Sequence, residues 1–333
     1  MVMSLSVIIS VWKRPVQLLL IFKELNIQAE KNNIPLEVIV ADSYSGEDID
    51  DVISESIPKF LYLNIIHKHT KNILASKRNL GAELATATHL IFLDDDCVPE
   101  ENYILHALND ISKFDGNTIL CGEVRFEPHK VVESNYYRYR DSRHPLFSYS
   151  GYSEMTAWNF VAMNCIIPKE ILLTKKISYN DSFVGYGGED HEFGWQIVKN
   201  NIKILSSSNR IIHHEYHGSI KLYVKKIQLA SRDGAVILKK ICPEIFKGHH
   251  KLMAIEWLFS KKNILGYLIK IAVFNSIFSN MILNYLEKTD KNKKLYFPKL
   301  YRYALISAYI QGMRERGTIK QSDLLNNWYT GTD

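Results

Sequence analysis

The sequence is poor in cysteine, the residue that forms the disulfides of small secreted proteins and many structural zinc sites. It has 333 residues but only four cysteines, and no two of them form a CxxC pair. Neither a disulfide framework nor a zinc knuckle is therefore indicated, and a reducing compartment is expected. The N-terminus also lacks a basic segment and a small-residue cleavage site around its first apolar run. We therefore expect no signal peptide and a cytoplasmic protein.

A long uninterrupted hydrophobic run is absent as well. The longest apolar stretch, residues 264–286, is long enough to cross a bilayer, but polar side chains interrupt it at Lys270, Asn275, Asn280 and Asn284. We expect a helix that lies at a membrane interface or in a protein core. Lysines flank the stretch on both sides, which makes peripheral contact with a membrane one expectation for it. They are Lys261, Lys262, Lys288, Lys291, Lys293 and Lys294.

The rest of the composition is that of an ordinary globular protein. Hydrophobic residues make up 46% of the chain and charged residues 23%, which excludes a disordered or collagen-like chain. At roughly 150 residues per domain, the length suits one large α/β domain or a catalytic domain with an appendage. We expect a catalytic domain over residues 1–218 and a basic helical region over residues 219–333.

The net charge of +5 is unevenly distributed along the chain. From Lys221 onward, twenty Lys and Arg accompany eight Asp and Glu, a net charge of +12, which leaves −7 for residues 1–220. The basic third is expected to meet something anionic, such as a lipid surface, a diphosphate-bearing acceptor or an acidic partner. The alternative is a basic face that is only solvated. We expect no nucleic-acid partner.

Short apolar runs alternate with helical patterns in the first hundred residues. Strands are expected over residues 5–10, 36–41, 61–66 and 89–93, and helical patterns over residues 16–25, 49–57 and 72–86. This alternation predicts a largely parallel, doubly wound α/β sheet with its ligand at the carboxyl ends of the strands. Farther along, we expect a helix near residues 101–113 and strands near 118–126 and 159–167. The tyrosine-rich residues 134–158 lack apolar periodicity and predict a long loop.

Three consecutive carboxylates, Asp94, Asp95 and Asp96, follow the strand expected at residues 89–93. They repel one another at the exit of a buried strand, so a cation should offset them. Mg²⁺ or Mn²⁺ prefers one or two carboxylates together with phosphate oxygens, which a nucleotide-diphosphate substrate would supply. Strand alternation would place Asp94 and Asp96 on one side and Asp95 on the other. The alternative is an acidic turn without a ligand.

Two further motifs combine groups that can do chemistry. A glycine pair, Gly187 and Gly188, leads into Glu189 and Asp190, a pattern that predicts a tight loop before the first turn of a helix. Its carboxylates could either complement the helix dipole or take a proton from an attacking hydroxyl. The second motif, residues 211–217, is a short strand followed by His213, His214 and His217. One imidazole could complete a manganese site begun by Asp96, and alternation prevents His213 and His214 from both pointing inward.

Four segments in this order, LSVIISVWKRP, VIVADSYS, ASKRNLGAELATATHLIFLDDD and FVGYGGEDHEFGWQI, resemble the inverting glycosyltransferases of family 2, which have the GT-A fold. The GGED segment further resembles the galactosyltransferase C-terminal motif and the chondroitin-polymerase type of domain. The resemblance covers about residues 4–218. It implies a nucleotide-sugar donor, a divalent metal ion and a sugar-transfer reaction.

The resemblance also implies residue roles. Nucleotide contacts are implied for Ser10, Val11 and Arg14 beside the base, Asp42 on uracil, Arg78 and Asn79 near the diphosphate and ribose, and Asp94 and Asp95 in the acidic motif. Metal ligands are implied among Asp96, Asp94 and either His213 or His214. The acceptor would meet Tyr186, Gly187, Gly188 and Glu189, and Asp190 would be the catalytic base, with Glu189 as the other candidate. Ser43 and Tyr44 replace the second acid and the glycine of the usual VDDGS turn, and Tyr186 stands where galactosyltransferases commonly carry tryptophan, so no particular sugar is implied.

The sequence thus predicts a metal-dependent inverting glycosyltransferase that uses a UDP-sugar with Mn²⁺ or Mg²⁺. Its acceptor would be a glycan, a lipid-linked glycan or a peptide in bacterial glycan or polysaccharide synthesis. One alternative is a sugar-nucleotide pyrophosphorylase, which would carry a glycine-rich loop after its first strand, whereas SVWKRP contains no glycine. Another is a catalytically inactive scaffold at a membrane surface, which the intact acidic and histidine motifs disfavour.

Overall fold

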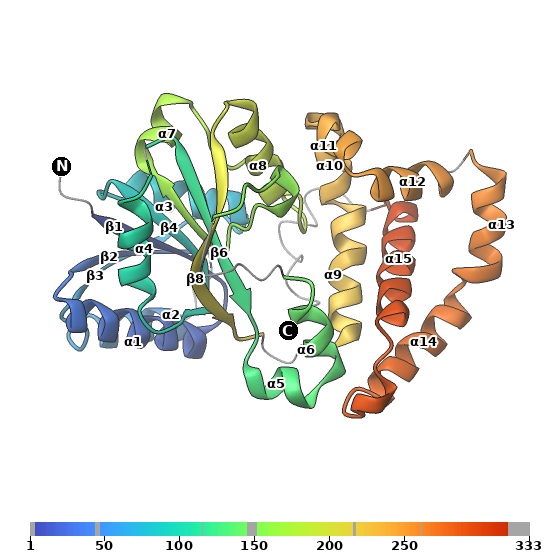
Figure 1. Ribbon diagram of the computed structural model, residues 1–333, viewed down its shortest axis with the longest axis horizontal. Helices are drawn as coiled ribbons and strands as arrows, with labels where there is room; N and C mark the ends of the chain where they lie inside the picture. The colour runs from blue at the N-terminus through green and yellow to red at the C-terminus, as the bar shows by residue number, and fades with distance from the viewer. Residues whose placement is uncertain are drawn as a thin grey trace. The chain divides into compact units, whose positions relative to one another are not determined.

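The computed structural model describes residues 4–43, 47–114, 116–144, 152–215, 218–260 and 262–318. The chain divides into two compact units (Figure 1). The sheet unit consists of Met1–Glu127, His144–Asp181 and Asp190–Glu215, and the helical unit of Pro128–Arg143, Ser182–Glu189 and Tyr216–Asp333. Two segments that precede residue 218 thus group with the C-terminal helices, and a catalytic domain that ends at residue 218 stays a prediction.

The sheet unit is built on one eight-stranded mixed sheet with the order β3-β2-β1-β4-β7-β6-β8-β5. Its strands are β1 (Leu5–Val11), β2 (Leu36–Asp42), β3 (Leu63–His69), β4 (His89–Asp94), β5 (Cys97–Pro99), β6 (Thr118–Arg125), β7 (Asn164–Pro168) and β8 (Lys203–His213). The first four strands pair in parallel, β6 also pairs in parallel with β8, and β7 and β5 are antiparallel to their neighbours. The predicted α/β fold with a mostly parallel sheet is confirmed.

Helices cover both faces of this sheet. They are α1 (Pro15–Asn32), α2 (Glu47–Ser56), α3 (Leu74–Leu84), α4 (Tyr103–Ile111), α7 (Lys169–Thr174) and α8 (Glu189–Lys199), with a 3₁₀ turn at Ala157–Asn159. Alternation along β1 explains the two layers, because Val7 and Ile9 belong to the core that includes α1, whereas Ile8 faces α3. A side chain at Gly81 of α3 would clash with Ile8, so glycine allows the close packing there.

The helical unit contains α5 (Pro128–Glu133), α6 (Asn135–Asp141), α9 (Ile220–Arg232), α10 (Gly234–Ile241), α11 (Pro243–Gly248), α12 (His250–Leu258), α13 (Ile264–Val273), α14 (Ser276–Lys288) and α15 (Pro298–Arg314), with a 3₁₀ turn at Lys293–Leu295. The loop predicted over residues 134–158 is wrong at its start, where α6 forms. The hydroxyl of Ser134 caps α6, and the ring of Tyr139 stacks on Tyr301 at 4.7 Å, so its tyrosines belong to a packed helix. Residues 145–151 of that segment lie outside the described residues.

The apolar stretch at residues 264–286 forms two helices, not the single helix that was expected. The chain breaks between α13 and α14, where the side chain of Asn275 accepts a hydrogen bond from the backbone N–H of Phe278 and so caps α14. Among the described residues, no single helix is long and apolar enough to cross a membrane, and by length and composition alone only the pair α13 and α14, bent by 46°, could do so.

Candidate active site

Parallel strands deliver polar residues to one edge of the sheet. Ser10 of β1 is in register with Asp94 of β4, and Val11 is in register with Asp42 of β2. Because the carboxyl ends of parallel strands meet at the same edge, these positions border one site. The hydroxyl of Ser10 is buried and has no hydrogen-bond partner among the described residues. Val11 buries its side chain in the core, and its carbonyl accepts a hydrogen bond from Lys77 Nζ at 2.7 Å.

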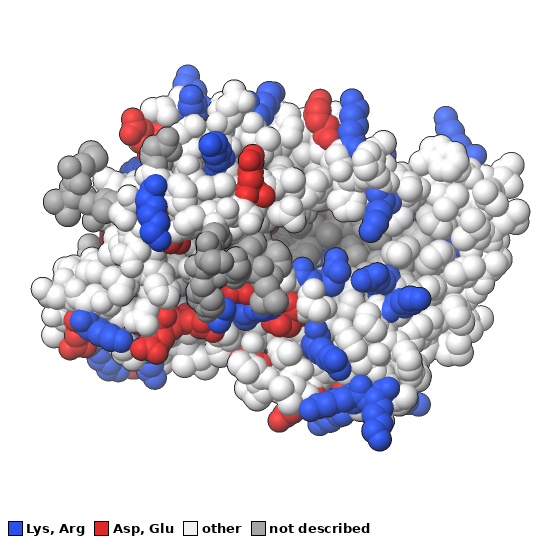
Figure 2. All heavy atoms as spheres, viewed as in Figure 1, with Lys and Arg blue, Asp and Glu red and all other residues white. Residues whose placement is uncertain are grey.

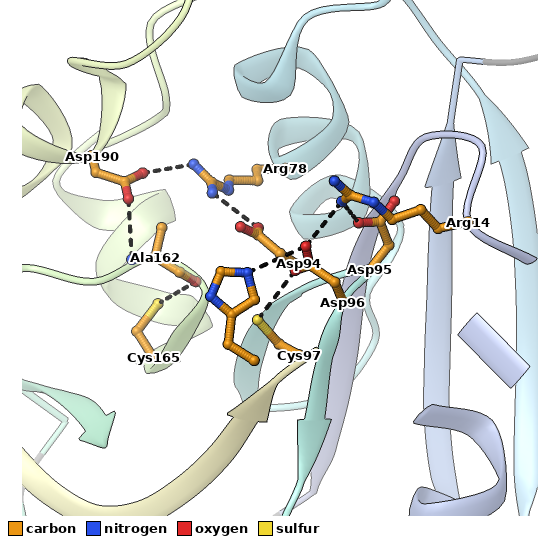
Figure 3. Close-up of polar contacts among 10 residues, drawn as sticks. Arg14, Arg78, Asp94, Asp95, Asp96, Cys97, Ala162, Cys165 and Asp190 are labelled. Atoms are coloured by element: carbon orange, nitrogen blue, oxygen red, sulfur yellow. Dashed lines mark hydrogen bonds and ion pairs between the residues drawn. The ribbon is translucent and has the colours of Figure 1, made fainter. Parts of the chain in front are cut away.

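The chain turns immediately after Asp94, and the turn brings Asp95 and Asp96 to the same guanidinium (Figure 3). Arg14 Nη1 lies 2.5 Å from Asp95 Oδ1 and 3.1 Å from Asp96 Oδ2. The backbone N–H of Trp12 also donates to Asp95 Oδ2 at 2.6 Å. The expected alternation, with Asp95 on the side opposite to Asp96, does not hold, because β4 ends at Asp94 and strand geometry does not continue through the turn.

Burial raises the pKa values of two carboxyl groups in the acidic turn. Burial raises the pKa of Asp95 to about 6, and the charge of Asp96 adds to this effect while Arg14 opposes it. Burial also raises the pKa of Asp94, against the opposing effect of Arg78. Carboxyl groups with raised pKa values at the end of a strand are the setting in which a bound cation stabilises the ionised form.

The C-terminal end of β8 brings a histidine to this turn. β5 and β8 are antiparallel, and Cys97, which follows the acidic turn, pairs with His213. His213 Nε2 lies 3.3 Å from Asp96 Oδ2. The next residue, His214, points elsewhere, since its Nδ1 lies 3.0 Å from Glu127 Oε1. Of the two histidines proposed for a metal, the fold brings His213 to Asp96, and His217 lies outside the described residues.

A buried arginine links the acidic turn to the start of α8. Arg78, which is buried in α3, places Nη2 at 3.2 Å from Asp94 Oδ1 and Nη1 at 2.7 Å from Asp190 Oδ1 (Figure 3). The other oxygen of Asp190 accepts a hydrogen bond of 3.4 Å from the backbone N–H of Ala162. The guanidinium also lies over the ring of Tyr179, 5.0 Å from its centroid. The bridge fixes the carboxylate of Asp190 relative to the acidic turn.

A second polar cluster surrounds the buried carboxylate of Asp42. Its Oδ1 accepts a hydrogen bond from the backbone N–H of Ser43 at 2.6 Å, and its Oδ2 lies 3.7 Å from His67 Nε2 and 3.8 Å from His69 Nδ1. Asp50 Oδ1 lies 3.4 Å from the other ring nitrogen of His67. The two imidazoles belong to His67 and His69 at the C-terminal end of β3, which pairs in parallel with β2.

Two groups of side chains have donor atoms suited to a metal ion. Asp96 Oδ2 and His213 Nε2 lie 3.3 Å apart. Neighbouring ligands of an ion with bond lengths of about 2.1 Å are separated by roughly 3 Å, so the two atoms are close to the spacing that an ion requires. A carboxylate together with an imidazole suits Mn²⁺. This pair therefore fits the predicted ion. The side chains of Asp42, His67 and His69 form the second group, with donor atoms within 4.8 Å of one another.

A family model settles the chain's relationship to known proteins. The model of glycosyl transferase family 2 matches residues 6–173, which is half of the chain. The chain belongs to this family. It is a glycosyltransferase, and the acidic turn, Arg14, Arg78 and the Asp42 cluster all lie within the matched residues. No curated protein sequence matches the chain.

The fold of this glycosyltransferase is shared with solved structures of low sequence identity. TarS of S. aureus, residues 1–349, is 16% identical, with a TM-score of 0.52 over 94% of this chain and 91% of that one. The mannosyltransferase PcManGT of Pyrobaculum calidifontis is 13% identical, with a TM-score of 0.56 over 93% of this chain and 85% of that one. The expected GT-A type of architecture with a helical C-terminal region is thereby confirmed.

In the helical unit of the glycosyltransferase, the predicted tight loop before α8 is present. Gly187 and Gly188 have φ values of +77° and +103°, which only glycine adopts without strain, and α8 begins at Glu189. Gly187 packs against Ala230 of α9, and its carbonyl abuts Gly234 at the start of α10, where a side chain would clash. Tyr186 belongs to the same loop, and its contact with an acceptor stays a prediction.

Three polar residues of the glycosyltransferase site, Lys77, His67 and His69, were not singled out from the sequence. Burial lowers the pKa of Lys77 to about 8, although the charges of Asp95 and Asp42 oppose this effect. Lys77 immediately precedes Arg78 in α3. Two adjacent cations in the helix that leads into β4, the strand ending in Asp94, were the sequence signal that could have identified it. The amide of Asn79 exchanges two hydrogen bonds of 2.8 and 2.9 Å with the backbone of Tyr179, and its place near the diphosphate stays a prediction.

Proposed function

We propose that this glycosyltransferase is metal-dependent and inverting and that it transfers a sugar from a UDP-sugar to an acceptor hydroxyl. The observation that carries the proposal is the Arg78 bridge between Asp94 and Asp190, because it couples the acidic motif to a carboxylate at the start of α8. At one end of the bridge Asp94 would face the sugar donor, and at the other end Asp190 would face the acceptor.

Asp96 and His213 would hold Mn²⁺ or Mg²⁺, with Asp94 beside the ribose. When bound, the ion would offset the negative charge of the diphosphate and so stabilise the leaving nucleotide. Arg14 Nη1 lies 3.1 Å from Asp96 Oδ2 and offsets part of the negative charge of the acidic turn. Support for a metal comes from PcManGT, whose structure was solved with GDP-Man and Mn²⁺.

Asp190 would act as the catalytic base. One of its oxygens is held by Arg78, and the other would accept the proton of the acceptor hydroxyl. The acceptor oxygen then forms a bond to the anomeric carbon as the bond from that carbon to the β-phosphate oxygen breaks, and the electron pair leaves with the nucleotide. Attack opposite to the leaving group inverts the anomeric configuration. Glu189, Tyr186, Gly187 and Gly188 would contact the acceptor.

Asp42 would accept a hydrogen bond from uracil, in a corner completed by Ser10 and the backbone of Val11. His67 and His69 add two nitrogen donors or acceptors beside the same carboxylate. A TarS structure in complex with UDP supports a uridine nucleotide, whereas PcManGT, which shares the fold, was solved with GDP-Man. The Arg78 side chain, with Asn79 behind it, would face the ribose and diphosphate.

We assign the enzyme to bacterial glycan or polysaccharide synthesis in the cytoplasm. Support for a reducing compartment comes from the sequence, which has only four cysteines and no CxxC pair. Membership of the family favours sugar transfer over the pyrophosphorylase alternative, and the intact acidic and histidine groups disfavour an inactive scaffold.

A donor-hydrolysis panel tests the proposal without an acceptor. UDP- and GDP-sugars are incubated with the full chain, with Mn²⁺ and with a chelator, and released nucleotide is measured. We expect slow Mn²⁺-dependent release from at least one UDP-sugar. Release from GDP-sugars alone would overturn the uridine assignment. Equal release with Mn²⁺ and with the chelator would overturn the proposed metal dependence.

A further inference from the structure

The helical unit exposes many large apolar side chains on α12, α13 and α14. In soluble proteins large exposed apolar patches mark interaction sites. Here the exposed fraction reaches 70% for Trp257, 77% for Ile264 and 82% for Ile277. We call the following residues the apolar surface: Trp257, Ile264, Leu265, Tyr267, Leu268, Ile271, Val273, Ile277, Phe278 and Met281.

Helical spacing places these side chains on outward faces. Along α13, Ile264, Leu268 and Ile271 recur at intervals of three and four residues, and Gly266 on the opposite side is buried. A side chain at Gly266 would clash with the carbonyl of Leu258, so α13 packs tightly on the end of α12. The glycine side of α13 is therefore turned to the protein, whereas apolar side chains on most of the rest of the helix are exposed.

The same division holds for α14. Ile277 and Met281 are exposed, whereas Ser279, Ile282 and Leu286 on the other side of the helix are buried. The hydroxyl of Ser279 hydrogen-bonds that of Ser307 in α15 at 2.6 Å. The inner side of α14 is thus occupied by α15, and its outer side exposes Ile277 and Met281 together with Asn280 and Asn284.

The charges around the apolar surface are of one sign. Between Trp257 and Leu286 the sequence has no Asp or Glu, but it has Lys261, Lys262 and Lys270. Lys270 Nζ lies 5.5 Å from the ring centroid of Tyr267, at the edge of the exposed face of α13. Figure 2 shows the region that Figure 1 labels α13 with blue groups but no red ones on the visible face. A second copy of this surface would bring lysines against lysines with no acidic partner, so self-association is disfavoured.

We propose that the apolar surface docks on an anionic phospholipid bilayer, with α13 and the outer side of α14 lying in the plane of the interface. Apolar side chains flanked by lysines are the composition that such helices have. Trp257 and Tyr267 would sit at the headgroup level, where aromatic residues with a polar end are favoured.

The helix lengths and anchors indicate docking in the interface, not a span. α13 has 10 residues and α14 has 13, so at 1.5 Å per residue neither reaches across the roughly 30 Å of a bilayer core. The elbow between them is also held to α15, because the ring of Phe274 stacks on Tyr303 at 5.2 Å and the Tyr303 hydroxyl donates to the carbonyl of Val273 at 2.6 Å. Straightening the pair into one span would break these contacts.

Vesicle flotation of the full chain tests the proposal. Vesicles of phosphatidylcholine alone are compared with vesicles that also contain phosphatidylglycerol, at low and high salt. We expect flotation with the anionic vesicles at low salt and weaker flotation at high salt, because screening shortens the reach of the lysines. Equal flotation with both vesicle types at low salt, or none with either, would overturn the proposal.

Variants separate the apolar and the charged contributions. The double change Leu265→Ser and Leu268→Ser should lower the partition coefficient by at least about tenfold, since two exposed leucines no longer enter the lipid. Lys262→Glu with Lys270→Glu should abolish the preference for anionic vesicles. The matched control is Leu61→Ser with Leu173→Ser, which removes two leucines of the sheet unit that are even more exposed than Leu265 and Leu268 and should leave flotation unchanged.

Two further readouts keep the outcome decisive. UDP affinity measured without vesicles reports on the proposed catalytic function. A protein that does not bind UDP could still float with vesicles, so the two proposals fail separately. Sedimentation equilibrium reports on self-association. A wild-type dimer that becomes monomeric in the Leu265→Ser, Leu268→Ser variant, together with no flotation of either, would show that the apolar surface binds protein and would overturn docking on lipid.

Discussion

Replacement of Arg78 by methionine should destabilise the glycosyltransferase and inactivate it. The change keeps the length of the side chain but leaves Asp94 and Asp190 without their shared cation, which lies 3.2 and 2.7 Å away. Loss of one partner from a buried ion pair costs about 3–5 kcal/mol. Because about a quarter of each carboxylate side chain is exposed, we expect the lower end, about 3 kcal/mol, or a drop in Tm of about 5–10 °C.

The loss should depend on pH. The pKa of Asp94 is already raised by burial, and removal of Arg78 takes away an effect that lowers it. A carboxyl group whose pKa is raised in the folded state stabilises the fold below that pKa and loses this contribution as the pH rises through it. The Arg78→Met variant should therefore be closer to wild type near about pH 5 than near about pH 8.

Urea unfolding and donor hydrolysis at the two pH values measure these effects. Arg210→Met is the matched control, because Arg210 also bridges two carboxylates, Glu123 at 2.8 Å and Glu100 at 3.3 Å, outside the proposed site. The control should lose stability but keep the hydrolysis rate of its folded fraction, whereas Arg78→Lys should recover stability in part and activity little, since lysine lacks the two-pronged geometry. An Arg78→Met protein with wild-type stability and turnover would refute the role of the bridge.

Three other changes test single residues. Asp190→Asn should leave UDP affinity within about twofold and lower donor hydrolysis by at least about 10²-fold, the low end for a general base, and near-wild-type turnover would remove Asp190 from the mechanism. Asp42→Ala should weaken calorimetric binding of UDP about tenfold without changing that of pyrophosphate with Mn²⁺, and an equal loss for both ligands would contradict a contact with the base. Ionisation of the buried Asp95 opposes folding, so this residue should lower the free energy of unfolding of wild type as the pH rises toward about 6. Asp95→Asn should remove this pH-dependent loss. Parallel curves of unfolding free energy against pH for the two proteins would contradict this.

The strand–helix alternation of the first hundred residues could be predicted because the buried strands are short, β-branched and bounded by polar turns. β1, β2 and β4 each occur within one residue or so of the expected range. Local patterns failed where tertiary packing decides, since α6 forms from tyrosines that pack on α9 and α15, with Tyr136 and Tyr223 at 6.3 Å. They also failed at Asn275, whose capping of α14 divides an apolar stretch with helical composition throughout.

The site was predictable residue by residue where motifs mark strand ends, and less so where partners come from distant segments. Nothing in the local sequence pairs Arg78 with Asp190, which is 112 positions later. The choice between His213 and His214 likewise depends on the pairing of β5 with β8, which sets the side chain that reaches Asp96. Asp95 was expected to point away from Asp96, and only the turn after β4 brings both to Arg14.

Calorimetric titration of UDP with and without Mn²⁺ tests the central claim most directly. Wild type should bind UDP more tightly with Mn²⁺, and Asp96→Ala and His213→Ala should each lose this metal-dependent gain, because a charged oxygen ligand or its nitrogen partner is missing. His214→Ala should keep it, since that imidazole pairs with Glu127. UDP binding by wild type that is the same with and without Mn²⁺, or a gain that survives in Asp96→Ala, would contradict the account.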